Sequence, residues 1–169
     1  FAAGFRAAYD EAPALDPDGH LVAWDLLREH AYAVHDLLGR HIDVRFEPAC
    51  PYKDPAEIRA DIVEHSRLVV TTEHSEHPYW SVMDNCVFRV VHDVIPHVLY
   101  DRQFTLVGEV EAFHDHLCFA PPGCEQAIFT EIFVYAAIRY TWGRYPERQK
   151  ACAFPELYRR YTAEFLPAA

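Results

Sequence analysis

The sequence is short of positive charge and lacks any C-x-x-C pair. Lys and Arg number 15 against 26 Asp and Glu, a formal net charge of −11, and the basic residues are scattered along the chain. We therefore expect no nucleic acid as a bound partner, although a nucleotide substrate stays open. The five cysteines offer no zinc-binding spacing, and three lie in apolar stretches, so we expect reduced core residues typical of a cytoplasmic protein.

Long apolar runs, repeats and low-complexity tracts are also missing. No apolar run has the length of a transmembrane span, and no basic-then-apolar leader opens the chain, so we expect no membrane partner and a cytoplasmic location. The chain starts at Phe1, which indicates that an initiating segment has been removed or is not included.

The rest of the composition is that of an ordinary globular domain. Of 169 residues, 51% are apolar and 24% charged, enough for a core without disulfides, and we predict a single domain, 1–169. Hydrophobic spacing predicts helices at about 20–38, 82–99, 105–118, 124–142 and 156–165, with short strands at 42–46 and 67–72, and the capping signature of Asp54, Pro55 and Glu57 predicts a helix to about Glu64. The predicted fold class is mainly α, a helical bundle-like domain with at most a small β-hairpin.

One carboxylate lies in the middle of an apolar segment. Residues 127–138, AIFTEIFVYAAI, contain ten apolar residues and a single acidic one, Glu131. A helix of this composition is apolar on every side, so no rotation about its axis brings Glu131 into water. An ionised carboxylate without a partner is costly to bury. We therefore expect a partner for Glu131 inside the protein.

The helix predicted at 82–99 carries two histidines and an aspartate. Its sequence VVHDVIPHVLY places His92, Asp93 and His97 on an otherwise apolar helix. For one histidine a hydrogen-bonded core position is the better interpretation, but the three residues together favour a ligand set. Pro96 cannot donate to the carbonyl of His92, so we predict a kink or break that could swing His97 beside His92.

The helix predicted at 105–118 offers two competing pairs. Glu111 and His114 form the E-x-x-H motif of ferritin-like di-iron proteins. On a helical wheel, however, Glu111 falls opposite the buried face, whereas Glu109 and His116 line up along its edge within about 20° of each other. We therefore take Glu109 and His116 as the inward pair and Glu111 as solvated. His114 stays undecided.

Inward polar residues on three late helices point to a transition-metal site. Three imidazoles and up to three carboxylates could bind one or two ions, whose charge makes buried carboxylates tolerable. The predicted ligands are His92, Asp93, His97, Glu109, His116 and Glu131. The alternative is a buried His–Glu hydrogen-bond network without metal. We expect iron, with zinc or manganese as alternatives, in a helical metal-binding core at about residues 80–145.

A composite motif runs through the same residues: HP-[FYW]…N-x-x-FR-x-VHD-x-x-x-H, then GE-x-x-A-x-x-x-H, then TE in an apolar helix. It appears here as His77-Pro78-Tyr79, Asn85, Phe88-Arg89, His92-Asp93, His97, Gly108-Glu109, Ala112, His116 and Thr130-Glu131. The motif, over about residues 73–150, resembles that of an uncharacterised family of hypothetical proteins from actinobacteria and bacteriophages. The resemblance implies the same ligands and omits Glu111 and His114. Pro96 is a departure, because the resemblance implies glycine at this position, and no established activity accompanies the resemblance.

Two enzyme classes and one non-enzymatic role fit such a site. A mixed His/carboxylate set in a helical fold favours a non-haem iron oxygenase or oxidase acting on a small molecule. The adjacent His92-Asp93 also resembles HD-domain phosphohydrolases, which need a first His on an upstream helix, where His65 is the candidate, and a late Asp, where this chain has Glu131. The third interpretation is a non-catalytic metal-binding module.

Three further residues near the ligands in sequence are candidates for catalysis or for orienting substrate: Arg89, Tyr100 and Tyr135. Core packing is an equally good explanation for each. The stretch EHSEH at residues 73–77 is expected to be a polar loop, with a second metal site as the alternative. The expected partner is a small-molecule substrate, and a homodimer stays open.

Overall fold

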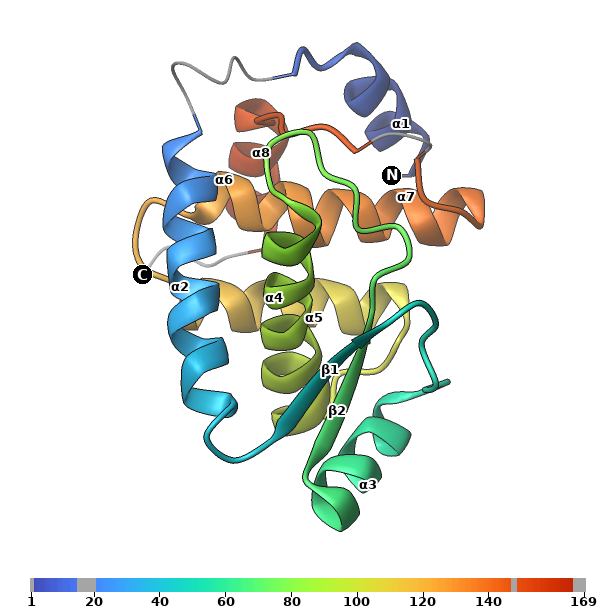
Figure 1. Ribbon diagram of the computed structural model, residues 1–169. Coiled ribbons are helices and arrows are strands. Elements are labelled where there is room, and N and C mark those ends of the chain that lie inside the picture. Colours follow the sequence, from blue (N-terminus) through green and yellow to red (C-terminus); the bar gives the residue numbers. More distant parts are fainter. Residues whose placement is uncertain (1, 15–20, 147–148, 166–169) are drawn as a thin grey trace.

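Helices dominate the chain, and the predicted mainly-α class is confirmed (Figure 1). The computed structural model describes residues 2–14, 21–146 and 149–165. The helices are α1 Ala2–Glu11, α2 Val22–Leu38, α3 Pro55–His65, α4 Val82–His92, α5 Leu106–Phe119, α6 Glu125–Ile128, α7 Tyr135–Trp142 and α8 Pro155–Phe165. Two π-helical segments, η1 Asp93–Leu99 and η2 Phe129–Val134, continue α4 and join α6 to α7. Helix α1 was not among the predicted helices.

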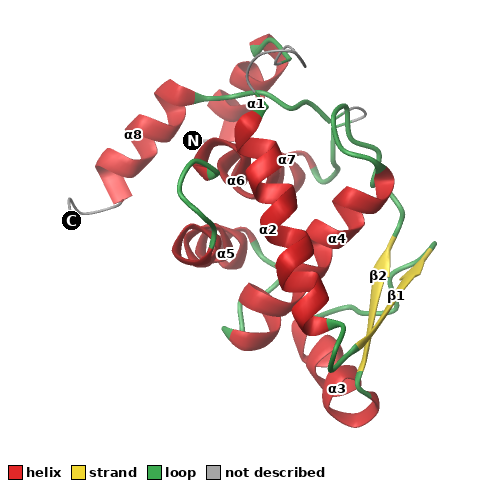
Figure 2. Ribbon diagram, turned by 60° about the vertical axis from the view of Figure 1, so that its left-hand side comes forward, coloured by secondary structure: helices red, strands yellow, loops and turns green. Residues whose placement is uncertain are grey.

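The strands β1, Asp43–Glu47, and β2, Arg67–Thr71, form a parallel pair, so the predicted hairpin is wrong. The register runs from Asp43 opposite Arg67 to Glu47 opposite Thr71. Helix α3 is the crossover between them (Figure 2). A crossover helix returns the chain to the starting end of the first strand, which makes the second strand parallel. The predicted helix between the two strands was therefore the signal against a hairpin.

Helix α4 is buried on two sides, which explains why apolar residues cover most of its circumference. Its Val87 and Val91 belong to the large core formed with α2, α5 and the α6–η2–α7 segment. Its Val90, with Val94 of η1, belongs to a smaller core formed with α3 and β2. Figure 1 shows α4 beside α2, with the two strands on its other side. Among the helices that the structure describes, none combines the length and apolar character needed to cross a membrane.

Side-chain caps fix where the helices of the later part of the chain begin. Ser81 and Asp84 form a capping box at the start of α4. Thr105 accepts a hydrogen bond from the backbone N–H of Gly108 at 3.1 Å, which closes the first turn of α5. A capped first turn holds its side chains in fixed directions. Glu109 follows directly in that turn.

All five cysteines are free, as expected. Cys86, Cys124 and Cys152 are buried, whereas Cys50 and Cys118 are exposed. The expected core position is therefore found for three of the five, and burial raises the pKa of the Cys124 and Cys152 thiols to about 11 and about 12.

Candidate metal centre

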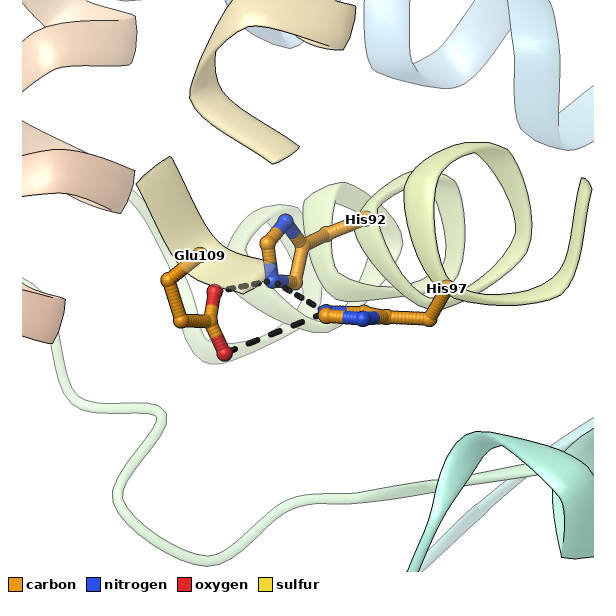
Figure 3. A group of neighbouring side chains, drawn as sticks. All are labelled: His92, His97 and Glu109. Carbon is orange, nitrogen blue, oxygen red and sulfur yellow. Dashed lines mark hydrogen bonds and ion pairs between the residues drawn. The ribbon is translucent and has the colours of Figure 1, made fainter. Parts of the chain in front are cut away.

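Three side chains converge where α4 and η1 face the first turn of α5 (Figure 3). The Nε2 atoms of His92 and His97 are 3.1 Å apart. The carboxylate of Glu109 lies 3.3 Å from Nε2 of His92 and 3.9 Å from Nε2 of His97. Each residue offers one ligand atom, and these atoms lie within 4.8 Å of one another. The group could therefore hold a metal ion.

The π-helical turn of η1 brings His97 beside His92. An α-helix would need an N–H at residue 96 for the carbonyl of His92, and Pro96 has none. In a π-helix each carbonyl pairs with the N–H five residues later, and the wider turn places such residues near each other. The ring centroids of His92 and His97 are 4.7 Å apart. The disturbance predicted at Pro96 thus takes the form of a π-helical segment.

A backbone carbonyl sets the proton position on His97. Its Nδ1 lies 2.6 Å from the carbonyl oxygen of Arg102, which can only accept, so Nδ1 carries the proton. Burial, and then the charge of His92, lowers the pKa of His97 to about 4, so this imidazole is neutral at pH 7. The remaining lone pair is on Nε2 and faces Glu109 and His92. A histidine that binds a metal through Nε2 needs this arrangement, with the proton on Nδ1 and the lone pair on Nε2.

Two contacts fix the loop that carries the Arg102 carbonyl. The guanidinium of Arg102 binds both carboxylate oxygens of Asp115, at 2.7 and 3.0 Å. At Gly108, a Cβ would lie 1.9 Å from the carbonyl oxygen of Gln103, so only glycine lets the loop approach α5 this closely. The orientation of His97 therefore depends on the packing of this loop against α5.

His92 has a partner on each ring nitrogen. Its Nδ1 lies 3.3 Å from Nε2 of His116, a neutral imidazole because burial lowers the pKa of His116 well below its usual range. Burial alone lowers the pKa of His92, but the hydrogen bond and charge of Glu109 outweigh it, and the pKa is raised. Burial raises the pKa of Glu109, yet His92 lowers it overall. A proton on His92 would thus also satisfy the group, which is the metal-free alternative.

Glu131 lies apart from this group and has its own partners. Its Oε1 accepts a hydrogen bond from the indole N–H of Trp24 at 2.8 Å and lies 3.1 Å from Nε2 of His77. Nδ1 of His77 accepts the backbone N–H groups of Tyr79 and Trp80, at 3.2 and 2.9 Å. The proton of His77 is therefore on Nε2 and points at Glu131. The expected partners of Glu131 are thus an indole and an imidazole, not the other predicted ligands.

Two more of the predicted ligands lie next to the three-residue group without belonging to it. Asp93 lines the groove beside His92, and burial raises the pKa of Asp93 to about 6. His116 lies behind His92, on the side away from Glu109, and is fully buried. The structure therefore gathers three of the six predicted ligands and places His116 as a support for one of them.

The two residues set aside on α5 are also outside the group. Glu111 is 48% exposed and lies 3.4 Å from the guanidinium of Arg102. This agrees with its expected place on the solvated face. The undecided His114 has its Nε2 3.0 Å from the hydroxyl of Tyr161, so it contacts α8.

The three candidate catalytic residues take different places. Arg89 donates to the carbonyls of Thr71, Glu73 and His74, and it lines the groove. Tyr135 lines the inner cavity, but its hydroxyl donates to the carbonyl of Lys150 and accepts the N–H of the same residue, at 2.9 and 2.8 Å. Tyr100 is 44% exposed and packs against Phe119, and it lines neither space.

The segment of residues 73–77 is a loop, as expected, but its last side chain is buried completely. His77, missed as a site residue, contacts Glu131 from there. The only available signal was its place in the composite motif. In the part of the chain that the structure describes, the group of His92, His97 and Glu109 is the one with metal-binding spacing, so no second site is found in this loop.

A groove and an inner cavity meet at the three-residue group. The groove has a volume of about 420 Å³ and is lined by His92, His97 and Glu109 together with residues of β2, the following loop and α7. The inner cavity, of about 100 Å³, extends from His92 and Glu109 to Glu131. The group is therefore reachable by a small molecule.

Comparison of the chain with models of protein families, with curated proteins and with solved structures finds no match. The resemblance to the hypothetical-protein family stays a prediction.

Proposed function

We propose that the chain is a metal-dependent oxidoreductase that binds one non-haem iron ion through His92, His97 and Glu109 and acts on a small molecule. The observation that carries the proposal is the donor set, two imidazole nitrogens and one carboxylate within 4.8 Å. Two histidines and one carboxylate that leave coordination positions open are typical of non-haem Fe(II) oxygenases. Bound iron would supply one-electron and dioxygen chemistry at this place.

The surroundings of the donors support a cation. The carbonyl of Arg102 holds the proton of His97 away from the group, and the neutral imidazole of His116 lies 3.3 Å from the far nitrogen of His92. Such partners fix the direction of ligating imidazoles and raise their basicity. Without a metal, a proton on Nε2 of His92 is needed to hydrogen-bond to Glu109. A divalent ion bound to both side chains would replace this proton.

The number of donors supports a catalytic rather than a structural ion. Structural zinc sites are closed by four protein ligands, usually cysteine and histidine. Here three donors converge, no cysteine among the described residues belongs to the group, and a groove reaches it. Substrate would enter through this groove. The apolar side chains of Phe88, Ile132 and Ala136 line the inner cavity and would limit the water that reaches the donors.

The HD-type hydrolase is the second candidate, and one observation favours it: Asp93 lines the groove next to His92. Its requirement for a first histidine from an upstream helix is poorly met. The candidate His65 is 59% exposed at the end of α3, where its Nε2 lies 3.9 Å from the carboxylate of Glu64, and it lines neither the groove nor the inner cavity. We therefore keep the oxidoreductase as the proposal.

Anaerobic loading with ferrous iron, followed by exposure to air, tests the reaction class. We expect about one iron per chain and a ferric absorption change on oxidation, because a carboxylate ligand stabilises the higher oxidation state. His97→Ala should abolish both results, and Glu111→Ala should keep both. The test is repeated with candidate small molecules present.

Two outcomes would decide against the proposal. Iron that binds but never reacts with air, together with manganese-dependent cleavage of phosphoesters, would make the hydrolase the better conclusion. A folded protein that takes up no transition metal would favour the hydrogen-bond network centred on a protonated His92.

A further inference from the structure

Two arginines lie in the groove, and their partners differ. Arg89 donates to three backbone carbonyls at the end of β2 and in the loop after it, at 3.0, 2.9 and 3.1 Å. Arg139, in the last turn of α7, has no hydrogen bond and no carboxylate partner among the residues that the structure describes. Its guanidinium lies over the ring of Tyr145, 5.6 Å from the ring centroid. The guanidinium of Arg89 is therefore used to hold the backbone, whereas the guanidinium of Arg139 is available to bind a ligand.

Other half-buried arginines of the chain show what Arg139 lacks. Arg102 binds Asp115 at 2.7 Å, and it holds the loop beside the metal ligands. Arg67 binds Asp61 at 3.0 Å and ties β2 to α3. A partly desolvated guanidinium is normally paired in this way, because it has five N–H donors to satisfy.

The position of Arg139 on its helix explains its positive charge but not its place in the groove. A cation in the last turn of a helix is favoured by the helix dipole. That effect accounts for a positive charge near the end of α7. It does not account for a guanidinium that lines the same groove as His92, His97 and Glu109.

We propose that Arg139 binds the carboxylate of a small organic acid, and that such acids are the substrate class of this groove. The inference rests on the proposed function, since the groove leads from Arg139 to the proposed iron ligands. The planar guanidinium matches a carboxylate through two parallel hydrogen bonds. Tyr140 and Tyr145 line the groove and offer aromatic faces to the apolar body of the acid. A volume of about 420 Å³ suits a small ligand.

The charge of the groove favours a carboxylate over a phosphate. Glu73, Asp93 and Glu109 line the same groove. Their carboxyl groups repel a dianion more strongly than a monoanion. A carboxylate carries one charge, and its other end can be apolar, whereas a phosphate monoester carries about two charges at neutral pH.

Calorimetric titration of the full chain tests the inference, once metal-free and once loaded anaerobically with ferrous iron. The probes are benzoate, phenylacetate and hexanoate, with benzyl alcohol as the neutral analogue and phenyl phosphate as the dianion. We expect at least one of the three acids to bind and benzyl alcohol to bind at least about tenfold more weakly.

The variants separate Arg139 from a general effect of charge. Arg139→Gln should weaken binding of the acid at least about tenfold. Arg139→Lys should restore part of this binding, because lysine keeps the positive charge but cannot form two parallel hydrogen bonds to a carboxylate. The matched control is Arg159→Gln, which removes an exposed arginine of α8 that pairs with Glu156 outside the groove. It should bind the acid as the wild type does. Circular dichroism and thermal unfolding show whether each variant is folded.

Three results would overturn the inference: none of the acids binds to the wild type, Arg139→Gln binds them as tightly as the wild type, or phenyl phosphate binds more tightly than every acid. Metal analysis of the same samples keeps this apart from the proposed function. If iron binds normally and the acids do not bind, only the inferred substrate class is wrong. If the acids bind through Arg139 but the chain takes up no metal, only the proposed function is wrong.

Discussion

Glu109 and Glu131 are two largely buried glutamates that line one inner cavity, yet they have opposite surroundings. Glu131 receives two N–H groups, from Trp24 and His77, on one oxygen. Glu109 faces Nε2 of His97, which carries a lone pair, and lies 3.3 Å from Nε2 of His92. The first carboxylate is satisfied by the protein, and the second has room for a cation. Burial alone therefore does not distinguish the two carboxylates, whereas the direction of the neighbouring protons does.

The difference comes from backbone groups on the far side of two imidazoles. Nδ1 of His77 faces two backbone N–H groups, which forces the ring proton onto Nε2, toward Glu131. Nδ1 of His97 faces a backbone carbonyl, which holds the ring proton away from Glu109. An imidazole thus serves as a hydrogen-bond donor in one place and offers a lone pair in the other.

The largest expected effect is on metal content. Glu109→Ala and His92→Ala should lose the metal, since removing a ligand exceeds the roughly 10- to 100-fold loss in affinity that follows removal of an outer partner. Glu131→Gln should keep it, because Glu131 is paired elsewhere. Elemental analysis of the purified variants measures this, with Glu111→Ala as the control on the same helix. Equal depletion in Glu131→Gln and Glu109→Ala would remove the contrast between the two glutamates.

A second effect concerns stability and should be specific to Glu131. Glu131→Ala leaves the N–H groups of Trp24 and His77 without an acceptor, so we expect the free energy of unfolding to fall by about 2–4 kcal/mol. Glu131→Gln retains one acceptor oxygen and should lose less. Urea unfolding in the presence of a chelator measures both. Stability that stays unchanged in Glu131→Ala, with metal lost, would instead make Glu131 a ligand.

The smallest effect tests the support of His97. A methyl group at Gly108 must displace the backbone of Gln103, so Gly108→Ala should cost about 1–3 kcal/mol and weaken metal binding by moving the neighbouring Arg102 carbonyl. Gly39→Ala is the matched control: its φ is −62° and the nearest atom to a new Cβ is at 3.3 Å, so we expect a change within about 0.5 kcal/mol. Thermal unfolding and metal titration distinguish the two variants. Equal stability and equal metal affinity of the two variants would show that the loop of Gln103 can move at no cost in free energy.

Much of the fold could be predicted from local patterns. Hydrophobic spacing located α2, α4, α5 and the long α6–η2–α7 segment, because apolar residues recur with the period of a helix wherever one side is buried. The capping signature of Asp54, Pro55 and Glu57 located α3. The strands were found as well, but their direction was wrong. Alternating hydrophobicity indicates that a segment is extended and does not state which way its partner runs. Helix α1 was missed by the same criteria.

The wheel of α5 also separated Glu109 from Glu111, because a helix fixes the directions of its own side chains. Pro96 identified the place where α4 gives way to a π-helix, because a missing N–H disturbs the turn before it in any surroundings.

On the late helices the sequence by itself thus determined which residues face inward, but not what each one meets. The partner of Glu131 is Trp24, 107 residues away, and no helical wheel contains that information. The proton position on His97 depends on the carbonyl of Arg102, which Asp115 and the close approach at Gly108 hold in place. Periodicity specifies a direction about a helix axis, whereas a hydrogen bond needs two atoms within about 3 Å, and only the packing of distant segments brings them there.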